Sequence, residues 1–275
     1  MNTSVLVSVL MSVYNDVEYL NESIESVLGQ TYPEFEFIII NDGSTDGSND
    51  ILEYYAKQDK RIRLYNQYNM GLTKSLNRGL RLCAGKYVFR QDADDISISN
   101  RLETQLLHIQ KNDLVLCFSW YDVIDEGGNL ICPMVFDDSY KKITKNLNRG
   151  RTIYAHGSAV FDREIVLSKG GYPEHVKLGQ DLRVWKKICK TTGQVGAVRT
   201  NLYQLRLRKC SISKKTRNYR YNHVLHNYLF RDQNRRDLLQ NSFFLLRNDR
   251  LYFAELLKLL VCLQPINYKW LFKFS

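Results

Sequence analysis

The chain has 275 residues, of which 44% are hydrophobic and 25% charged, proportions typical of a globular protein and not of a disordered one. This length accommodates one large domain, or one domain with an appendage, around a sizeable core. The net charge of +10 is concentrated near the end of the chain, because residues 199–275 carry 16 Lys and Arg against 4 Asp and Glu. A basic segment is attracted to nucleic acid, to an anionic membrane or to a phosphate-bearing substrate. No nucleic-acid-binding module accompanies this charge, so we expect no nucleic acid partner.

The cysteines and the N-terminus indicate a cytoplasmic compartment. No two cysteines form a CxxC pair or another zinc-type spacing, so we expect free thiols in a reducing environment. The six are Cys83, Cys117, Cys132, Cys189, Cys210 and Cys262. The first residues lack the basic leader of a signal peptide, and no stretch reaches the roughly 18 apolar residues of a membrane-spanning helix.

Strand and helix patterns alternate over the first 112 residues. Runs of apolar, β-branched residues predict strands, and helical spacing of apolar residues predicts helices, the first with Asn15 as N-cap and Gly29 as its stop. Strands are predicted at 5–13, 35–40, 62–65 and 87–89, and helices at 16–29, 46–57, 72–84 and 98–110. This alternation predicts a mostly parallel central sheet flanked by helices on both faces, an α/β fold.

The pattern changes after residue 114. Segments 114–120 and 130–135 predict a hairpin, a further strand is expected at 158–161, and a short helix at 181–190. Beyond Ser213 the pattern is helical to the end, with a break at Pro265. We therefore divide the chain into an α/β domain, residues 1–213, and a basic amphipathic helical extension, residues 214–275.

Polar clusters follow three of the predicted strands, at residues 12–15, 41–43 and 91–95. Ligands of parallel sheets bind beyond the carboxyl ends of the strands, so these clusters are expected to meet at one crevice. In the last cluster, Asp92, Asp94 and Asp95 would repel one another unless a cation lies between them. Alternate carboxylates at a strand end can hold one divalent ion. The same acids also suit a turn that caps the next helix.

Three other residues carry a functional and a purely structural interpretation. Asp42, in the turn 41–46, is either an Asx-turn residue, with Asp46 as helix N-cap, or an acceptor left free for a base or ribose. Asp181 is either a first-turn acid of a helix or a catalytic carboxylate. His156 taken alone is more often a packed or capping histidine than a functional one.

Together these motifs resemble the family 2 glycosyltransferases of the GT-A fold. The resemblance runs from about residue 7 to residue 213 and rests on a series of motifs in a fixed order. They are VSVLMSVYN at 7–15, SVLGQTY at 26–32, NDGSTDGS at 41–48, NMGL and SLNRG within 69–79, DADD with RLE within 92–103, GGY at 170–172 and QD at 180–181.

The resemblance implies an inverting enzyme that moves a hexose from a nucleotide diphosphate donor, such as UDP-glucose, UDP-galactose or an N-acetylated form, to an acceptor hydroxyl. It implies Asp181 as general base, and Asp94 with Asp92 as ligands of Mn2+ or Mg2+. Such a metal neutralises the leaving diphosphate, a carboxylate takes the acceptor proton, and a single displacement inverts the anomeric carbon. The expected donor-binding residues are Tyr14, Asn15, Asp42, Asn77, Arg78, Asp92 and Arg208.

The sequence departs from the family pattern at three places. Gln180 stands where Glu often precedes the base, and residues 182–185 read LRVW instead of YDLW. Arg208 stands where many relatives have a histidine. Arginine does not ligate metals but grips a diphosphate. The third metal ligand is therefore open, and a cationic clamp is expected in its place.

The tail, residues 219–275, interleaves aromatic and leucine residues with cations. It is expected either to pack on the domain or to lie on an anionic membrane surface. With the resemblance, this predicts a cytoplasmic enzyme, peripheral on the inner face of the membrane, that acts on a lipid-linked saccharide in O-antigen, capsule or exopolysaccharide assembly.

Two alternatives remain at this point. A nucleotide-sugar-binding or scaffolding protein would not need Asp42, Asp94 and Asp181 together. A nucleotidyltransferase would carry a glycine- and lysine-rich loop near the first strand, where residues 12–15 read SVYN.

Overall fold

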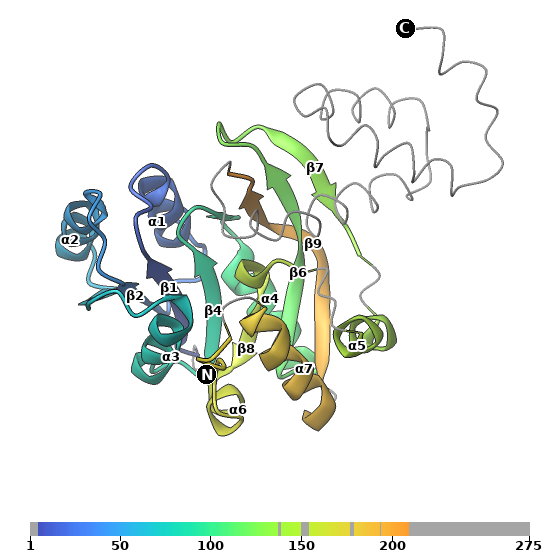
Figure 1. Cartoon of the computed structure of the whole chain (residues 1–275). Helices are drawn as coiled ribbons and strands as arrows, with labels where there is room; N and C mark the ends of the chain where they lie inside the picture. Colours follow the sequence, from blue (N-terminus) through green and yellow to red (C-terminus); the bar gives the residue numbers. More distant parts are fainter. Residues whose placement is uncertain (1–4, 137–138, 150–153, 177–178, 193, 209–275) are drawn as a thin grey trace, which may run out of the picture. The chain divides into compact units, whose positions relative to one another are not determined.

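The computed structural model of the chain describes residues 5–136, 139–149, 154–176, 179–192 and 194–208. The expected extension at 214–275, with its predicted helices and membrane surface, lies outside these ranges, as do Cys210 and Cys262. Within them, the strands form one nine-stranded sheet with helices around it (Figure 1). This arrangement confirms the predicted α/β class.

The first half of the sheet is parallel. Its strands are β1 (Val7–Val13), β2 (Phe35–Asn41), β3 (Ile62–Asn66) and β4 (Tyr87–Asp92). β1 lies between β2 and β4, and β3 pairs with the outer side of β2. The crossovers contain α1 (Leu20–Leu28), α2 (Ser48–Gln58) and α3 (Leu72–Leu82). Because all four strands run the same way, the residues after each one meet at a single edge.

The second half of the sheet is mixed. Its strands are β5 (Ile96–Ser97), β6 (Leu116–Ile124), β7 (Leu130–Met134), β8 (Val160–Asp162) and β9 (Val195–Arg206). The order across the whole sheet is β3-β2-β1-β4-β8-β6-β9-β5, and β7 pairs with β6. β8 is antiparallel to both neighbours, and β9 runs parallel to β6. The helices here are α4 (Arg101–Lys111), α5 (Tyr140–Asn148), α6 (Arg163–Ser168) and α7 (Gln180–Thr192), and a 3-10 turn covers His156–Ser158.

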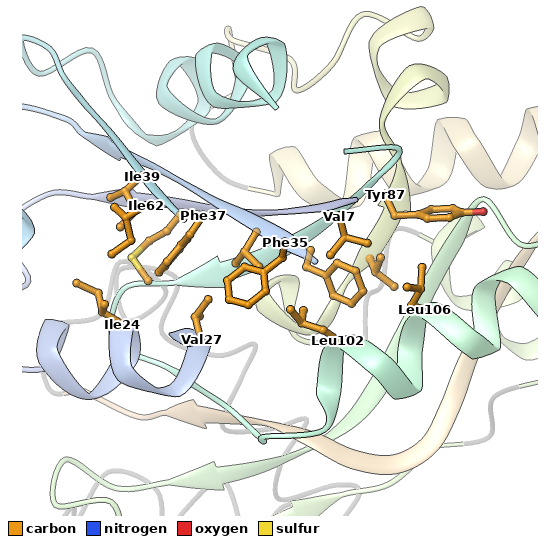
Figure 2. Close-up of a cluster of buried hydrophobic side chains, with 14 of the residues drawn as sticks. Val7, Ile24, Val27, Phe35, Phe37, Ile39, Ile62, Tyr87, Leu102 and Leu106 are labelled. Atoms are coloured by element: carbon orange, nitrogen blue, oxygen red, sulfur yellow. The ribbon is translucent and has the colours of Figure 1, made fainter. Parts of the chain in front are cut away.

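Alternation along the central strands divides the core between the two faces of the sheet. In β1, Val7, Val9, Met11 and Val13 join the cluster drawn in Figure 2, whereas Leu10 meets α3 on the other face. The cluster combines Ile24 and Val27 of α1 with Leu102 and Leu106 of α4, against Phe35, Phe37, Ile39, Ile62 and Tyr87 of the strands. Burial on both faces explains why the central residues 37–40 of β2 are all apolar.

The sequence predicted the central elements but missed several others. The strands at β1 to β4, the helices α1 to α4 and the β6–β7 hairpin are confirmed, with shifted ends. Asn15 is not the N-cap of the first helix, which begins at Leu20, four residues after the predicted start at residue 16. β5, α5, α6 and the long strand β9 were not predicted. Residues 195–206 mix polar and apolar types, and their identity as a strand depends on pairing with β6, which is distant in sequence.

Two smaller features of the described ranges concern the length of apolar helices and the state of the cysteines. No helix among these residues is both long and apolar enough to span a bilayer. The cysteines within them, Cys83, Cys117, Cys132 and Cys189, are buried as free thiols.

The contact between α3 and the sheet yields a stability test at Gly79. A Cβ on Gly79 would lie 2.2 Å from Cδ1 of buried Leu10. Glycine to alanine stabilises an exposed helix by about 1 kcal/mol, but overpacking costs about 1–3 kcal/mol. We expect Gly79→Ala to lower the free energy of unfolding in urea titrations. Lys74→Ala, on the exposed side of α3, should change the free energy of unfolding by less than about 0.5 kcal/mol. A Gly79→Ala protein more stable than the wild type would contradict the packing of α3 on Leu10.

Candidate active site

The acidic turn of residues 92–95 begins where β4 ends, at the carboxyl edge of the sheet. Directly behind it lies Arg90, whose side chain is fully buried. Its Nη1 donates to the Leu10 carbonyl oxygen at 3.1 Å, and its Nη2 forms an ion pair with Asp92 Oδ1 at 2.6 Å. Arg90 therefore orients Asp92 and joins it to β1. A second constraint comes from β9, because the Asp92 backbone N–H donates to the Tyr203 hydroxyl at 3.1 Å.

A second buried arginine, Arg101, lies at the start of α4. Its guanidinium donates five hydrogen bonds and lies 4.8 Å from the centroid of the Tyr203 ring. The acceptors are side-chain oxygens of Gln91, Ser97 and Gln105 and the carbonyl oxygens of Arg90 and Gly157, at 2.6–3.2 Å. Burial lowers the pKa of Arg101 to about 10, so the group remains a cation at neutral pH. It joins β4 and β5, which flank the acidic turn, to the turn at His156–Ser158.

Asp95 faces inward from the acidic turn and is buried. Burial, reinforced by the charges of Asp94 and Asp92, raises the pKa of Asp95 well above its usual range. Its Oδ1 accepts the backbone N–H of Arg206 at 2.8 Å, and Arg206 Nε donates to the Asp94 carbonyl oxygen at 2.9 Å. The end of β9 thus fixes the backbone of the acidic turn, and Asp95 has a structural role.

Asp94 faces the solvent side of the turn and shares a cation with Asp16. Nη1 of Arg208 lies 3.2 Å from Asp94 Oδ2 and also pairs with Asp16 Oδ1. Burial, together with the charges of Asp92 and Asp16, raises the pKa of Asp94 to about 6, although Arg208 opposes the shift. The two carboxylates outweigh burial at Arg208 and raise the pKa of its guanidinium. The structure therefore pairs Asp94 with Arg208, whereas Asp92 of the same turn pairs with Arg90.

Asp42 differs from the expectation of a free acceptor. Its side chain is only 1% exposed, and it accepts hydrogen bonds from Gln67 Nε2 at 2.6 Å and from the backbone N–H groups of Met70 and Gly71, both at 2.8 Å. Arg78 acts on the same contact, because its Nη1 donates to Gln67 Oε1 at 2.8 Å. Asp42 and Arg78 therefore hold the loop between β3 and α3, and their direct contact with a donor stays a prediction.

The backbone around Asp42 explains part of the NDGS motif. Gly43 has a φ of +76°, and a Cβ there would lie 2.8 Å from the backbone N of Asn69. Glycine is therefore required for both conformation and space. Asn15 also adopts a positive φ of 55°, and its Oδ1 accepts the Thr45 N–H at 2.8 Å. Asn15 thus joins the end of β1 to this turn.

The remaining predicted donor residues lie in different environments. Tyr14 is 48% exposed at the end of β1, where its ring is accessible to a ligand. Asn77 is 5% exposed, and its amide pairs with the backbone N–H and carbonyl of Tyr172, both at 2.8 Å. Asn77 therefore holds the loop of residues 170–172, and the geometry gives no support for its predicted contact with the donor.

Asp181 lies in the first turn of α7, within electrostatic reach of Tyr172. Burial raises the pKa of the Tyr172 hydroxyl; Arg90 opposes this, and Asp181 and Asp92 add to it. The hydroxyl also lies 3.0 Å from Nε2 of His156. The candidate base and the acidic turn therefore act electrostatically on the same buried ring, although they are far apart in sequence.

The carboxylates near the turn do not form a closed metal cage. In the part of the chain that the structure describes, no group of three His, Cys, Asp or Glu side chains is arranged to hold a metal ion. Mg2+ at phosphate sites is commonly bound by one or two carboxylates, with water and substrate phosphates completing the octahedron. Asp94 and Asp92 fit this open arrangement.

Sequence comparison places the chain among known proteins. Residues 8–167 match the profile of Glycosyl transferase family 2. The chain belongs to this family. It is 31% identical over 184 residues to the O-antigen biosynthesis glycosyltransferase WbnJ of Escherichia coli, covering 66% of this chain and 71% of WbnJ. It is 30% identical over 222 residues to TuaG of Bacillus subtilis, a putative teichuronic acid biosynthesis glycosyltransferase, covering 77% and 83%.

Other relatives are considerably longer. An uncharacterized glycosyltransferase of Rickettsia bellii is 31% identical over 206 residues, which are 74% of this chain and 29% of that protein. The chain thus spans less than a third of this relative.

Solved structures support the fold. TarS 1-349 of S. aureus in complex with UDP-GlcNAc superposes with a TM-score of 0.63 at 18% identity, covering 88% of this chain and 74% of TarS. The mannosyltransferase PcManGT of Pyrobaculum calidifontis, in complex with GDP-Man and Mn2+, gives 0.61 at 18%, covering 86% and 68%. These likenesses confirm the predicted GT-A fold.

Several residues of this family 2 site were not predicted from the sequence. Asp16 directly follows the recognised YN motif, and Arg101 belongs to the quoted RLE motif, but neither received a role. Arg90, Tyr172 and Tyr203 act through burial. For Arg90, a charge directly after the apolar residues 87–89 of β4 is a signal that could have revealed it.

The hydrogen bonds of Arg101 predict a strong preference for arginine over lysine. A lysine keeps the charge but donates at most three hydrogen bonds from a single nitrogen, which leaves buried acceptors unpaired. We expect Arg101→Lys to lower the free energy of unfolding by about 2–3 kcal/mol, measured in urea. The same change at Arg63, whose side chain is 45% exposed, should cost less than about 1 kcal/mol. Equal losses at both positions would contradict the role of Arg101.

Proposed function

We propose that this chain is an inverting, metal-dependent glycosyltransferase that moves a hexose from a UDP-sugar to an acceptor hydroxyl. The observation that carries the proposal is the acidic turn at the carboxyl edge of a GT-A sheet, where Asp92 pairs with Arg90 and Asp94 with Arg208. Membership of family 2 supports the reaction class. The nucleotide-sugar complexes of TarS and PcManGT support a donor of this chemistry.

The donor would bind at the edge formed by the ends of β1, β2 and β4. Tyr14 offers an exposed ring to the base, and Asp42 and Asn15 shape the loops around the nucleoside. Asp94, with Asp92, would hold a divalent metal, and the Mn2+ in PcManGT is consistent with this. When bound, the metal neutralises charge that develops on the leaving diphosphate. Arg208 adds a second cation with several N–H donors for phosphate oxygens.

The chemical step requires a base on the side of the sugar opposite the diphosphate. Asp181 would accept the proton of the acceptor hydroxyl while its oxygen bonds to the anomeric carbon. The bond from that carbon to the diphosphate oxygen breaks at the same time, and UDP leaves with the electron pair. One displacement from the opposite face inverts the configuration. The neighbouring residue is Gln180, so a second carboxylate is not introduced beside the base.

The acceptor and the pathway are inferred more broadly. WbnJ is described as acting in O-antigen biosynthesis, and TuaG as a putative enzyme of teichuronic acid biosynthesis. Both products are cell-surface polysaccharides. We therefore propose a lipid-linked saccharide acceptor at the inner face of the cytoplasmic membrane. The basic tail at 214–275 would bring the enzyme to this surface.

The metal assignment is tested at Asp94. Asp94→Asn removes a charged ligand but keeps the size of the side chain, so we expect Mn2+-dependent thermal stabilisation by UDP to disappear. Asp113→Asn, an exposed change in the loop before β6, should leave that stabilisation intact. Full Mn2+-dependent stabilisation in Asp94→Asn would refute the assignment.

The base is tested by Asp181→Asn, which cannot accept a proton at neutral pH. We expect release of UDP from the donor to slow by at least about a hundredfold, while binding of UDP with Mn2+ is retained. Asp50→Asn is a matched control, because Asp50 is also a first-turn acid, in α2. Turnover of Asp181→Asn that equals the control would exclude the proposed role.

The membrane role of the tail is tested by vesicle co-sedimentation of the full chain and a chain that ends near Lys215. Each cation close to an anionic surface contributes about 1 kcal/mol, so only the full chain should bind anionic vesicles. Added salt should release part of it, and apolar residues should retain the rest. If the two chains sediment equally, or lipid charge has no effect, the tail is instead an appendage of the domain.

A further inference from the structure

Three segments of the chain supply the charges on the open side of the acidic turn. Asp16 comes from the turn after β1, Asp94 from the turn after β4, and Arg208 lies two residues beyond β9. Nη1 of Arg208 contacts carboxylate oxygens of both acids. The guanidinium also lies 5.0 Å from the centroid of the Tyr19 ring, which gives it a cation–π contact.

The guanidinium lies where a metal at Asp94 would have to compete with it. A divalent ion binds a carboxylate oxygen at about 2.0–2.6 Å, and Arg208 has no lone pair with which to ligate a metal. Asp94 Oδ2 cannot serve as a close metal ligand while it pairs with Nη1 of Arg208 at 3.2 Å, because the two cations repel each other. Binding of a metal at this oxygen therefore requires Arg208 to release it.

Asp16 is positioned to stay paired with Arg208 when Asp94 no longer pairs with it. The Asp16–Arg208 ion pair does not involve Asp94, and it leaves other N–H groups of the guanidinium available. The cation–π contact with Tyr19 is also independent of Asp94. Arg208 can thus remain beside the metal position without occupying it.

We propose that Arg208 is the internal counter-ion of Asp94 in the donor-free enzyme, and that binding of donor with metal transfers Asp94 from Arg208 to the metal. Asp16 is the positioning residue that retains Arg208 and directs its free N–H groups to the donor diphosphate. This inference rests on the proposed function and adds to it an order in which metal and donor bind. Metal alone binds weakly because it must displace Arg208 from Asp94, and the displaced guanidinium gains no new contact. Metal with diphosphate binds well because the displaced guanidinium gains phosphate contacts, which makes the two ligands cooperative.

The test uses two measurements that a single substitution should move in opposite directions. Mn2+ binding to the nucleotide-free protein is followed by electron paramagnetic resonance, and UDP binding at saturating Mn2+ by calorimetry. In Arg208→Gln we expect Mn2+ alone to bind about tenfold more tightly, equivalent to about 1.4 kcal/mol, and UDP to bind about tenfold more weakly. Uridine affinity should be unchanged, because uridine lacks the diphosphate.

Two further variants separate charge from geometry. Arg208→Lys retains a cation, so Mn2+ alone should bind as in the wild type while UDP affinity falls. Arg199→Gln removes the same charge from an exposed position in β9 and should leave both affinities unchanged.

Asp16 is tested by a double-mutant cycle with Arg208. Asp16→Asn should weaken UDP binding in the wild-type background and have little further effect in Arg208→Gln, because Asp16 acts through Arg208. Equal losses in the two backgrounds would show that Asp16 does not position Arg208.

The inference and the proposed function can fail separately. If Arg208→Gln binds Mn2+ alone no more tightly than the wild type, the counter-ion role is overturned, even where UDP with Mn2+ still binds. If the wild-type protein shows no binding of UDP with Mn2+ at all, the proposed function fails, and with it the order of binding proposed for Arg208.

Discussion

The site depends on one buried charge, the guanidinium of Arg101. A cation without water is stable only when its N–H groups are satisfied, and all five of its hydrogen bonds described above go to neutral oxygens. The acceptors belong to β4, to the segment around β5, to α4 and to the turn at His156–Ser158. None of these segments can move without leaving a buried partner unpaired, so Arg101 fixes the base of the acidic turn.

Around this fixed base, the charges are distributed by depth. The inner cations, Arg90 and Arg101, are fully buried and bind backbone carbonyl oxygens and side-chain oxygens. The outer cation, Arg208, is partly exposed and binds carboxylates that face the edge of the sheet. A rigid inner layer can thus hold the carboxylates in position while an outer cation is exchanged. This division explains how one short acidic motif can contain both a structural acid, Asp95, and a candidate metal ligand, Asp94.

The sequence predicted those parts of the fold and site that depend on local pattern. Apolar periodicity located β1 to β4 and α1 to α4, and the strand ends predicted that residues 12–15, 41–43 and 91–95 would follow parallel neighbouring strands at one edge of the sheet. It could not predict β9, because residues 195–206 become a strand by pairing with β6. It also could not show which groups bind the carboxylate of Asp42, since nothing in a turn motif shows that a loop 25 or more residues later will supply its hydrogen-bond donors. Roles that arise from long-range burial, as for Tyr172 and Tyr203, leave no local signal.

The position of β9 between β6 and β5 also has a consequence for synthesis of the chain. A nascent chain that has not yet released residues 195–208 from the ribosome lacks a partner strand for one side of β6, and unpaired strand edges promote association with other chains. The same nascent chain lacks Arg206 and Arg208, so Asp94 and Asp95 have not acquired these partners. Completion of the sheet and pairing of Asp94 with Arg208 are therefore a single late event, and a ribosome that stalls before residue 195 exposes both defects together.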